Sequence, residues 1–413
     1  MANHQNTSAN IGPRIFFAHG PGNVAGTLKN WEKGTEDDTI IAKTYSGQVF
    51  DIAKELSSKT LVITDGSSNY ALPDNSISVE ASSIGDMGNG LRYWLNMKKN
   101  AEFIARRAHD FKADVAIVSL HYGLLSLIAF RRYRIPVILD MHNTLWPLGH
   151  KPSFLKQLIL KVMGILCRNR LGAAVVVSPE CSRQLKTLLP NAKIFEHIPQ
   201  YPDTLKDISR SNALINDSEE FRILFSGRLE KFKGVFDIVD AAEILLRQGY
   251  TQIKWVFAGT GAAESELKTE IQRRNLSSHI ELKGQLCRTA LTDQLIKAQA
   301  TITPTCSGFS EGLAKAPLES LLAEIPALMS SVVPAADVVK KAAIIFPPSS
   351  PTAIANSVKI MIDNPSRYEA LCISSKEMKY KLFSNTMSYK NSIVNALSIT
   401  LKKELCEKTK ELQ

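Results

Sequence analysis

Two cations on one short stretch have the residue types and spacing to bind a diphosphate. Arg228 and Lys233 lie in residues 226–234, between an apolar run at 221–225 and a run with helical apolar spacing. The planar guanidinium of arginine forms paired hydrogen bonds with phosphate oxygens, and the lysine ammonium adds a point charge. Because both would lie at a strand's carboxyl end and beside a helix start, they predict a pyrophosphate site. The alternative is a solvated basic loop.

Two carboxylates, Glu311 and Glu319, lie further along the chain on either side of Gly312 and the residues that follow it. The apolar residues 298–302 predict a buried parallel strand, and three leucines between 318 and 322 predict a helix. We therefore place a helix N-terminus at Gly312, with free N–H groups for an anion, and Glu319 two turns along that helix. A carboxylate there can accept hydrogen bonds from two neighbouring ribose hydroxyls. Solvated helix faces produce the same spacing by chance.

Short apolar runs alternate with helical or looping stretches along the whole chain, which predicts parallel sheets with helices on both faces. The fold class is therefore α/β. With 413 residues and 44% apolar content, the chain is too long for one core, and two domains are expected. The expected strands cover residues 14–18, 60–63, 115–119, 137–139, 173–177, 221–225, 253–258, 280–282, 298–302 and 343–346.

Histidines and glycines follow the ends of several expected strands, where ligands bind in open α/β sheets. His19 precedes a loop with Gly20 and Gly22, which let a ligand approach the backbone, although the G-x-G-x-x-G spacing of a dinucleotide site is absent. His121 and His142 each follow a strand. We prefer an active-site role for His121 and leave His142 open between that role and a structural one. His19 is expected to line the site, and only an inverting enzyme would need it as a general base.

Together these residues resemble the motifs of retaining glycosyltransferases of the GT-B fold, family 4 (glycosyl transferases group 1). Residues 311–319 are similar to the family's E-x7-E motif, and residues 227–234 are similar to its G-R-L…K-G pair. Residues 197–203 resemble the turn that closes the family's first domain. Residues 315–316 and 335–337 depart from the family pattern, which leaves the transferred sugar open.

The resemblance implies two Rossmann-like domains that face each other across a cleft, with a C-terminal helix that crosses back to the first domain. The expected divisions are residues 1–205 for an acceptor-binding domain, 206–220 for a linker, 221–385 for a nucleotide-sugar-binding domain and 386–413 for the returning helix. Helices are expected at residues 352–362 and 388–405.

The resemblance also implies transfer of a sugar from a nucleotide diphosphate sugar to an acceptor hydroxyl with retained anomeric configuration, in cell-surface polysaccharide, lipopolysaccharide or glycolipid synthesis. Glu311 would orient the donor sugar and Glu319 the ribose, Arg228 and Lys233 would stabilise the departing diphosphate, and His121 would border the reacting sugar. No cofactor and no metal are expected, since no D-x-D sequence is present. Further donor-binding residues would be Gly20, Gly22, Gly227, Gly259, Gly284, Gly312, Leu313 and Ala314. A sugar-nucleotide 2-epimerase of the same fold and a non-catalytic binding scaffold stay open as alternatives.

The net charge of +10 is concentrated in residues 92–170, which hold fourteen Lys or Arg and four Asp or Glu. Such clusters attract the phosphates of a membrane surface or an anionic acceptor. Nucleic acid is not expected, because its binding motifs and interleaved aromatics are absent. Residues 154–170 fit an interfacial helix and an ordinary core helix equally. We therefore expect a glycan or lipid-linked acceptor and a peripheral contact with an anionic membrane through residues 92–170.

The sequence contains no apolar run of membrane-spanning length and no secretory signal, which predicts a cytoplasmic protein that could work at the inner face of the cell membrane. Six scattered cysteines without a C-x-x-C pair are expected to be reduced thiols.

Overall fold

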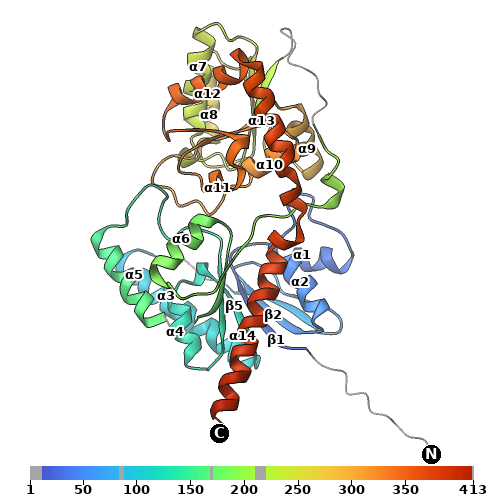
Figure 1. Ribbon diagram of the computed structural model, residues 1–413, viewed down its shortest axis with the longest axis vertical. Coiled ribbons are helices and arrows are strands. Elements are labelled where there is room, and N and C mark those ends of the chain that lie inside the picture. The colour runs from blue at the N-terminus through green and yellow to red at the C-terminus, as the bar shows by residue number, and fades with distance from the viewer. Residues whose placement is uncertain (1–11, 83–87, 168–170, 210–219, 412–413) are drawn as a thin grey trace, which may run out of the picture.

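Two parallel sheets, each covered by helices, form two domains that lie one above the other along the long axis of the molecule (Figure 1). The computed structural model describes residues 12–82, 88–167, 171–209 and 220–411, with side chains up to residue 402 in the last helix. Most of the expected linker, residues 210–219, lies outside the described residues. Among the described residues there is no helix with the length and apolar content needed to cross a bilayer.

The first sheet has the strand order β3-β4-β2-β1-β5-β6-β7-β8, and all neighbours are parallel except β3 and β4. Its central strands are continuous runs of apolar, often β-branched residues because helices cover both faces. The strands are β1 (Arg14–His19), β2 (Lys59–Thr64), β3 (Tyr70–Ala71), β4 (Ile77–Ala81), β5 (Val115–Ser119), β6 (Val137–Met141), β7 (Leu171–Val176) and β8 (Ile194–Glu196). The helices are α1 (Val24–Glu32), α2 (Tyr45–Glu55), α3 (Gly90–Asp110), α4 (Leu125–Arg131), α5 (Phe154–Cys167) and α6 (Pro179–Leu188).

The second sheet is wholly parallel and has the order β11-β10-β9-β12-β13-β14, which is the 3-2-1-4-5-6 order of a Rossmann fold. Its strands are β9 (Phe221–Ser226), β10 (Ile253–Ala258), β11 (Ile280–Leu282), β12 (Ala300–Thr303), β13 (Ala327–Ser330) and β14 (Ala343–Phe346). Its helices are α7 (Val235–Arg247), α8 (Glu264–Arg273), α9 (Arg288–Lys297), α10 (Ala316–Leu322), α11 (Ala336–Val339), α12 (Pro351–Asp363) and α13 (Pro365–Met378).

The last helix, α14 (Tyr389–Glu411), leaves the second domain and runs along the first (Figure 1). Tyr389, Ile393, Ala396 and Leu397 are at most 2% exposed and lie in one hydrophobic cluster with residues of β1, β5 and α2. The expected fold is therefore confirmed: two Rossmann-like domains of the GT-B type and a C-terminal helix that crosses back to the first.

The carboxyl edges of the two sheets face each other, because loops from both edges touch. A Cβ on Gly312, in the loop after β12, would lie 1.8 Å from the carbonyl oxygen of His142, in the loop after β6. Only glycine lets the two backbones approach so closely. Any ligand held by both edges would therefore lie between the domains.

Candidate active site

The loop after β9 carries the two predicted cations, and a glycine fixes its position. Gly234 has φ +73°, and a Cβ there would lie 2.1 Å from the carbonyl oxygen of Pro304, so the position requires glycine. This contact presses the loop onto the segment that follows β12. Lys233 is thereby brought beside Glu311, 78 positions away along the chain.

Lys233 and Glu311 form a direct ion pair. The Lys233 ammonium nitrogen lies 2.7 Å from both carboxylate oxygens of Glu311, and Thr305 Oγ1 donates a hydrogen bond of 3.0 Å to Oε2. The two side chains are only 15% and 11% exposed. Because solvent screens such a pair little, both charges are held in a fixed geometry at the carboxyl edge of the second sheet.

An aromatic pair lies between the two cations. Phe232 and Phe309 stack with ring centroids 4.1 Å apart and planes 14° from parallel. The Arg228 guanidinium lies 5.5 Å from the Phe232 centroid, and the Lys233 ammonium lies 5.0 Å from that of Phe309. Cations within about 6 Å of a ring face are attracted to it. Arg228, which is exposed, and Lys233 thus belong to one cluster with Glu311.

The second carboxylate, Glu319, is buried beside the same loop. Ser226 Oγ donates a hydrogen bond of 3.3 Å to its Oε2. Burial raises the pKa of Glu319, while Lys315 and the hydrogen bond from Ser226 oppose the rise. Solvent still reaches Lys315, but surrounding protein desolvates it and lowers its pKa, against the pull of Glu319. The Lys315 ammonium lies 5.9 Å from the ring centroid of Tyr45 in the first domain.

The predicted helix N-terminus at Gly312 is wrong. Helix α10 begins at Ala316, because Ala314 takes φ +68° and interrupts a helical path, and a proline occupies the first turn. Glu319 consequently lies in the first turn of α10 and not two turns along. Gly312 packs on the first domain, and Leu313 is 4% exposed, with its carbonyl bonded to the Ala335 amide at 3.1 Å.

The other three predicted site glycines of the second domain, Gly227, Gly259 and Gly284, lie on adjacent loops. The Gly259 amide donates to the carbonyl of Gly284 at 2.8 Å, and the Gly227 amide donates to that of Ala258 at 3.0 Å. A Cβ on Gly259 would lie 2.0 Å from the carbonyl oxygen of Gly227. The structure therefore brings these predicted residues together at the edge that holds Glu319.

The first domain contributes Gly20, Gly22 and His121 from loops that meet at its carboxyl edge. A Cβ on Gly20 would lie 3.7 Å from that of His121, and the Gly20 carbonyl accepts a hydrogen bond of 2.9 Å from Thr64 Oγ1. Gly22 lines a cavity of about 390 Å³ together with Asp65 and other residues at the ends of β1 and β2. Desolvation lowers the pKa of His121, and Asp65 opposes this. Burial also lowers the pKa of His19.

His142 belongs to a buried network whose other members the sequence did not indicate. Its Nε2 lies 2.9 Å from Oδ2 of Asp140, which also accepts a hydrogen bond of 3.0 Å from the Tyr389 hydroxyl. The Tyr45 ring packs 4.3 Å from the imidazole of His142. Burial, followed by the charge of His142, lowers the pKa of His197 to about 3. The one available signal was Asp140 itself, a charged residue in an apolar strand.

The same network contains the described residues that could hold a metal ion. Asp140, His142 and His197 each offer a ligand atom, and these atoms lie within 4.8 Å of one another. The hydrogen bonds from His142 and Tyr389 already account for one oxygen of Asp140. Burial alone would raise the pKa of this carboxyl, but the charge and hydrogen bond of His142, together with the charges of His197 and His19, lower it.

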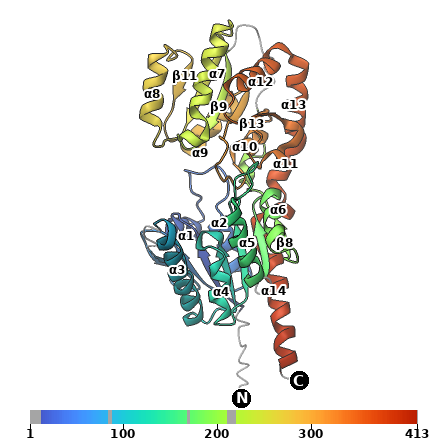
Figure 2. The ribbon, with the colours of Figure 1, turned by 90° about the vertical axis from the view of Figure 1, so that its left-hand side faces the viewer.

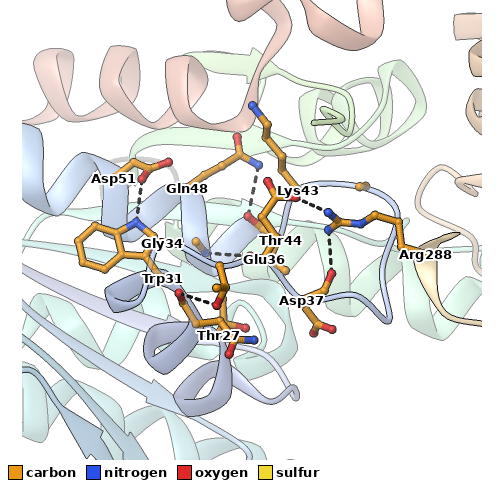
Figure 3. Close-up of a pocket in the computed structure, with 14 residues that line it drawn as sticks. Thr27, Trp31, Gly34, Glu36, Asp37, Lys43, Thr44, Gln48, Asp51 and Arg288 are labelled. Atoms are coloured by element: carbon orange, nitrogen blue, oxygen red, sulfur yellow. Dashed lines mark hydrogen bonds and ion pairs between the residues drawn. The ribbon is translucent and has the colours of Figure 1, made fainter. Parts of the chain in front are cut away.

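A second cavity, of about 340 Å³, lies where Arg288 of the second domain meets α1, α2 and the loop between them (Figure 3). Arg288 donates to the carbonyl oxygens of Ile40 at 2.9 Å and Asp37 at 2.7 Å, and it forms an ion pair with Glu36. Its lining includes no predicted site residue. Sequence reasoning missed Arg288 because nothing marks its partners, about 250 residues earlier in the chain.

Residues 207–378 match the family model described as glycosyl transferases group 1. No curated protein matches the chain. Among solved structures, HepE from Anabaena in complex with UDP has 15% identity and a TM-score of 0.64, covering 93% of this chain and 99% of that one.

Two further solved structures have the same fold. The alpha,alpha-trehalose-phosphate synthase (UDP-forming) from Burkholderia vietnamiensis has 11% identity and a TM-score of 0.70, covering 94% and 98% of the two chains. Sucrose-phosphate synthase from Thermosynechococcus elongatus has 13% identity and a TM-score of 0.63, covering 96% and 98%. The chain is therefore a protein of the GT-B fold, and the match over residues 207–378 supports its assignment to the glycosyltransferases.

Proposed function

We propose that this protein transfers a sugar from a nucleotide diphosphate sugar to an acceptor hydroxyl with retained anomeric configuration. One observation carries the proposal: Lys233 and Glu311 are joined at 2.7 Å at the carboxyl edge of a Rossmann-like sheet, on a loop that also carries Arg228 and begins at Ser226, which bonds Glu319. Nucleotides bind at this edge. Cations suit the diphosphate and carboxylates suit the hydroxyls of sugar and ribose.

The ion pair indicates how the donor would be engaged. A diphosphate oxygen that bonds the Lys233 ammonium would replace a Glu311 oxygen, and the released carboxylate could then accept hydrogen bonds from the donor sugar. Charge builds up on the diphosphate as the bond to the sugar breaks. Lys233 and Arg228 would stabilise that charge, and one such preorganised contact typically contributes about 2.7 to 4 kcal/mol to the barrier reduction.

The acceptor would approach from the first domain. Its hydroxyl would lie at the loops of Gly20, Gly22 and His121, beside the 390 Å³ cavity. Retention by attack on the face of the leaving group needs no protein base, since the departing phosphate takes the acceptor proton. His19 and His121 would then orient groups and exclude water, and general-base chemistry at His19 would belong to an inverting enzyme.

A panel of nucleotide sugars tests the proposal, beginning with UDP-glucose because HepE from Anabaena is described in complex with UDP-glucose. We expect nucleotide release that depends on an added acceptor, and an anomeric coupling in the product that matches the donor by NMR. An isomerised donor without acceptor would identify a 2-epimerase instead. The absence of both binding and turnover with every donor would favour a non-catalytic scaffold.

We further propose that the reaction needs no metal and serves cell-surface polysaccharide or glycolipid synthesis. The proposed diphosphate contacts are side chains of this chain, namely Arg228 and Lys233, so activity should survive EDTA. Loss of activity on chelation, restored by a divalent ion, would contradict metal independence.

A further inference from the structure

Two helices of the first domain expose large apolar side chains on the same side of the molecule. We define the α3–α5 face by Leu91, Trp94 and Leu95 of α3 and Phe154, Leu155 and Ile165 of α5, which are 40–84% exposed. Figure 2 shows α3, α4 and α5 next to one another on the side turned to the viewer. Exposed apolar patches of this kind mark sites where another body binds.

The exposure of side chains on α5 distinguishes between the two roles expected for it, an interfacial helix and an ordinary core helix. The apolar side chains at positions 154, 158, 162 and 165 recur at helical spacing and are all exposed, whereas Met163, Gly164 and Cys167 on the opposite side are buried in the domain. The core-helix interpretation is therefore wrong for most of the apolar stripe. The last residues of the predicted segment, 168–170, lie outside the described residues.

Cations accompany the apolar side chains. Helices α3 and α5 carry seven Lys or Arg and two Asp or Glu, and Arg92, Lys98, Lys99, Lys156 and Lys161 are exposed. An apolar helix face with flanking cations binds the boundary between headgroups and acyl chains of an anionic bilayer. Each cation near such a surface adds about 1 kcal/mol of attraction.

We propose that the α3–α5 face inserts into the surface of an anionic bilayer and brings the first domain to a lipid-linked acceptor. The helices would lie in the plane of the membrane, because the 14 residues of α5 extend only about 21 Å, less than the roughly 30 Å of a hydrocarbon core. A second copy of the chain fits this face poorly, since a two-fold contact would place its cations against one another.

The position of the face explains why the acceptor would be lipid-linked. Helices that connect parallel strands start at the carboxyl edge of the sheet, so the first turns of α3 and α5 lie near the edge that carries Gly22 and His121. Leu91 and Phe154 are in those first turns, and Trp94 follows directly after the first turn of α3. The acceptor part of the inference depends on the proposed function, whereas the bilayer contact does not.

Co-sedimentation of the full chain with vesicles tests the contact. We expect binding to phosphatidylcholine vesicles that contain about one third phosphatidylglycerol, weaker binding to phosphatidylcholine alone, and partial loss with salt. The double variant Phe154→Ser/Ile165→Ser should bind at least about tenfold more weakly. The matched control Ile360→Ser/Ile373→Ser removes exposed side chains from α12 and α13 and should bind as wild type.

Tryptophan fluorescence separates insertion from surface attraction. Vesicles should shift the emission to shorter wavelength, and Trp94→Phe should remove most of the shift. Absence of sedimentation at low salt would overturn the proposal, as would binding that salt abolishes but Phe154→Ser/Ile165→Ser leaves unchanged. A concentration-dependent dimer in light scattering, dispersed by the same double variant, would assign the face to a second copy.

The inference that the acceptor is lipid-linked is tested by a separate measurement of transfer rates. With a vesicle-embedded polyprenyl-phosphate sugar as the acceptor, the protein should release nucleotide from the donor faster than with the same sugar in free solution. The variant Phe154→Ser/Ile165→Ser should lower only the rate with the vesicle-embedded acceptor. Equal rates on both acceptors would overturn the lipid-linked acceptor while leaving the bilayer contact in place. No turnover with any donor, together with vesicle binding, would locate the failure in the proposed function.

Discussion

The carboxyl edges of the two sheets face each other but carry different chemistry. The edge of the second domain holds charges paired with one another, Lys233 with Glu311 and Lys315 near Glu319. The edge of the first domain holds imidazoles whose pKa is lowered, chiefly by desolvation: His19, His121 and His197. Each edge thus suits a different partner, the second an anionic donor and the first a neutral hydroxyl.

In the proposed reaction, this difference would place most of the transition-state stabilisation in the second domain. Fixed cations stabilise the charge that develops on a leaving diphosphate most effectively, and this electrostatic stabilisation is larger in a site that excludes water. Neutral imidazoles can orient a hydroxyl without drawing the diphosphate toward the wrong domain.

Removing Lys233 should have the largest effect. In Lys233→Ala we expect kcat to fall about 10²- to 10³-fold, or about 2.7 to 4 kcal/mol, because the diphosphate loses a preorganised contact and Glu311 loses its partner. Lys231→Ala is the matched control, since Lys231 lies on the same turn but pairs with exposed Glu266. Equal losses in the two variants, measured by steady-state nucleotide release, would remove the distinction between the paired cation and its neighbour.

Acid should destabilise the fold through His197. Its pKa of about 3 in the folded protein is below the ordinary 6.5, so the unfolded chain takes up the proton first. The contribution of His197 to the free energy of unfolding is fully present above pH 6.5. It is lost as the pH falls toward 3, and the loss is about 2 kcal/mol at pH 5. Urea unfolding between pH 5 and 7 should show a shallower pH slope in His197→Gln than in wild type, and an unchanged slope in the exposed control His150→Gln. Parallel curves for wild type and His197→Gln would contradict the assignment.

Removing the charge of Glu319 should have a smaller effect, on donor binding rather than on the chemical step. Glu319→Gln keeps the shape and one oxygen but loses the charge, so the donor KM should rise about fivefold to tenfold with little change in kcat. Glu324→Gln, two residues beyond α10, should leave the donor KM unchanged. A fall in kcat at constant KM would place Glu319 at the reacting sugar rather than at the ribose.

The smallest effect is expected at His121. A residue that only borders the sugar should cost less than about tenfold in kcat/KM when replaced in His121→Ala, whereas loss of a general base costs about 10²- to 10⁴-fold. His109→Ala, an exposed histidine on α3, serves as the control. A loss above a hundredfold would favour base catalysis from the first domain and an inverting course.

Buried strands could be predicted closely from the sequence. The expected strand at 115–119 coincides with β5, and the run 221–225 falls one residue short of β9, because strands covered on both faces must be continuously apolar. The edge pair β3 and β4 was missed, since edge strands mix polar and apolar residues and give no such run.

The site could be predicted in its residue types but not in its pairings. That Lys233 bonds Glu311 depends on the contact of Gly234 with Pro304, which no local pattern encodes. The network around Asp140 joins residues from β6 and α14, about 250 positions apart. Likewise the stripe of α5 is the same whether a domain or a bilayer covers it, so only the folded chain shows that most of it is uncovered.

The returning helix has a consequence for biosynthesis. Tyr389, Ile393 and Leu397 complete the core of the first domain, yet the ribosome makes them after the whole second domain. The first 200 residues therefore lack part of their apolar core until α14 has been synthesised, whereas the later domain can fold as a local unit before then. Chaperones that shield nascent chains would be needed most during that interval.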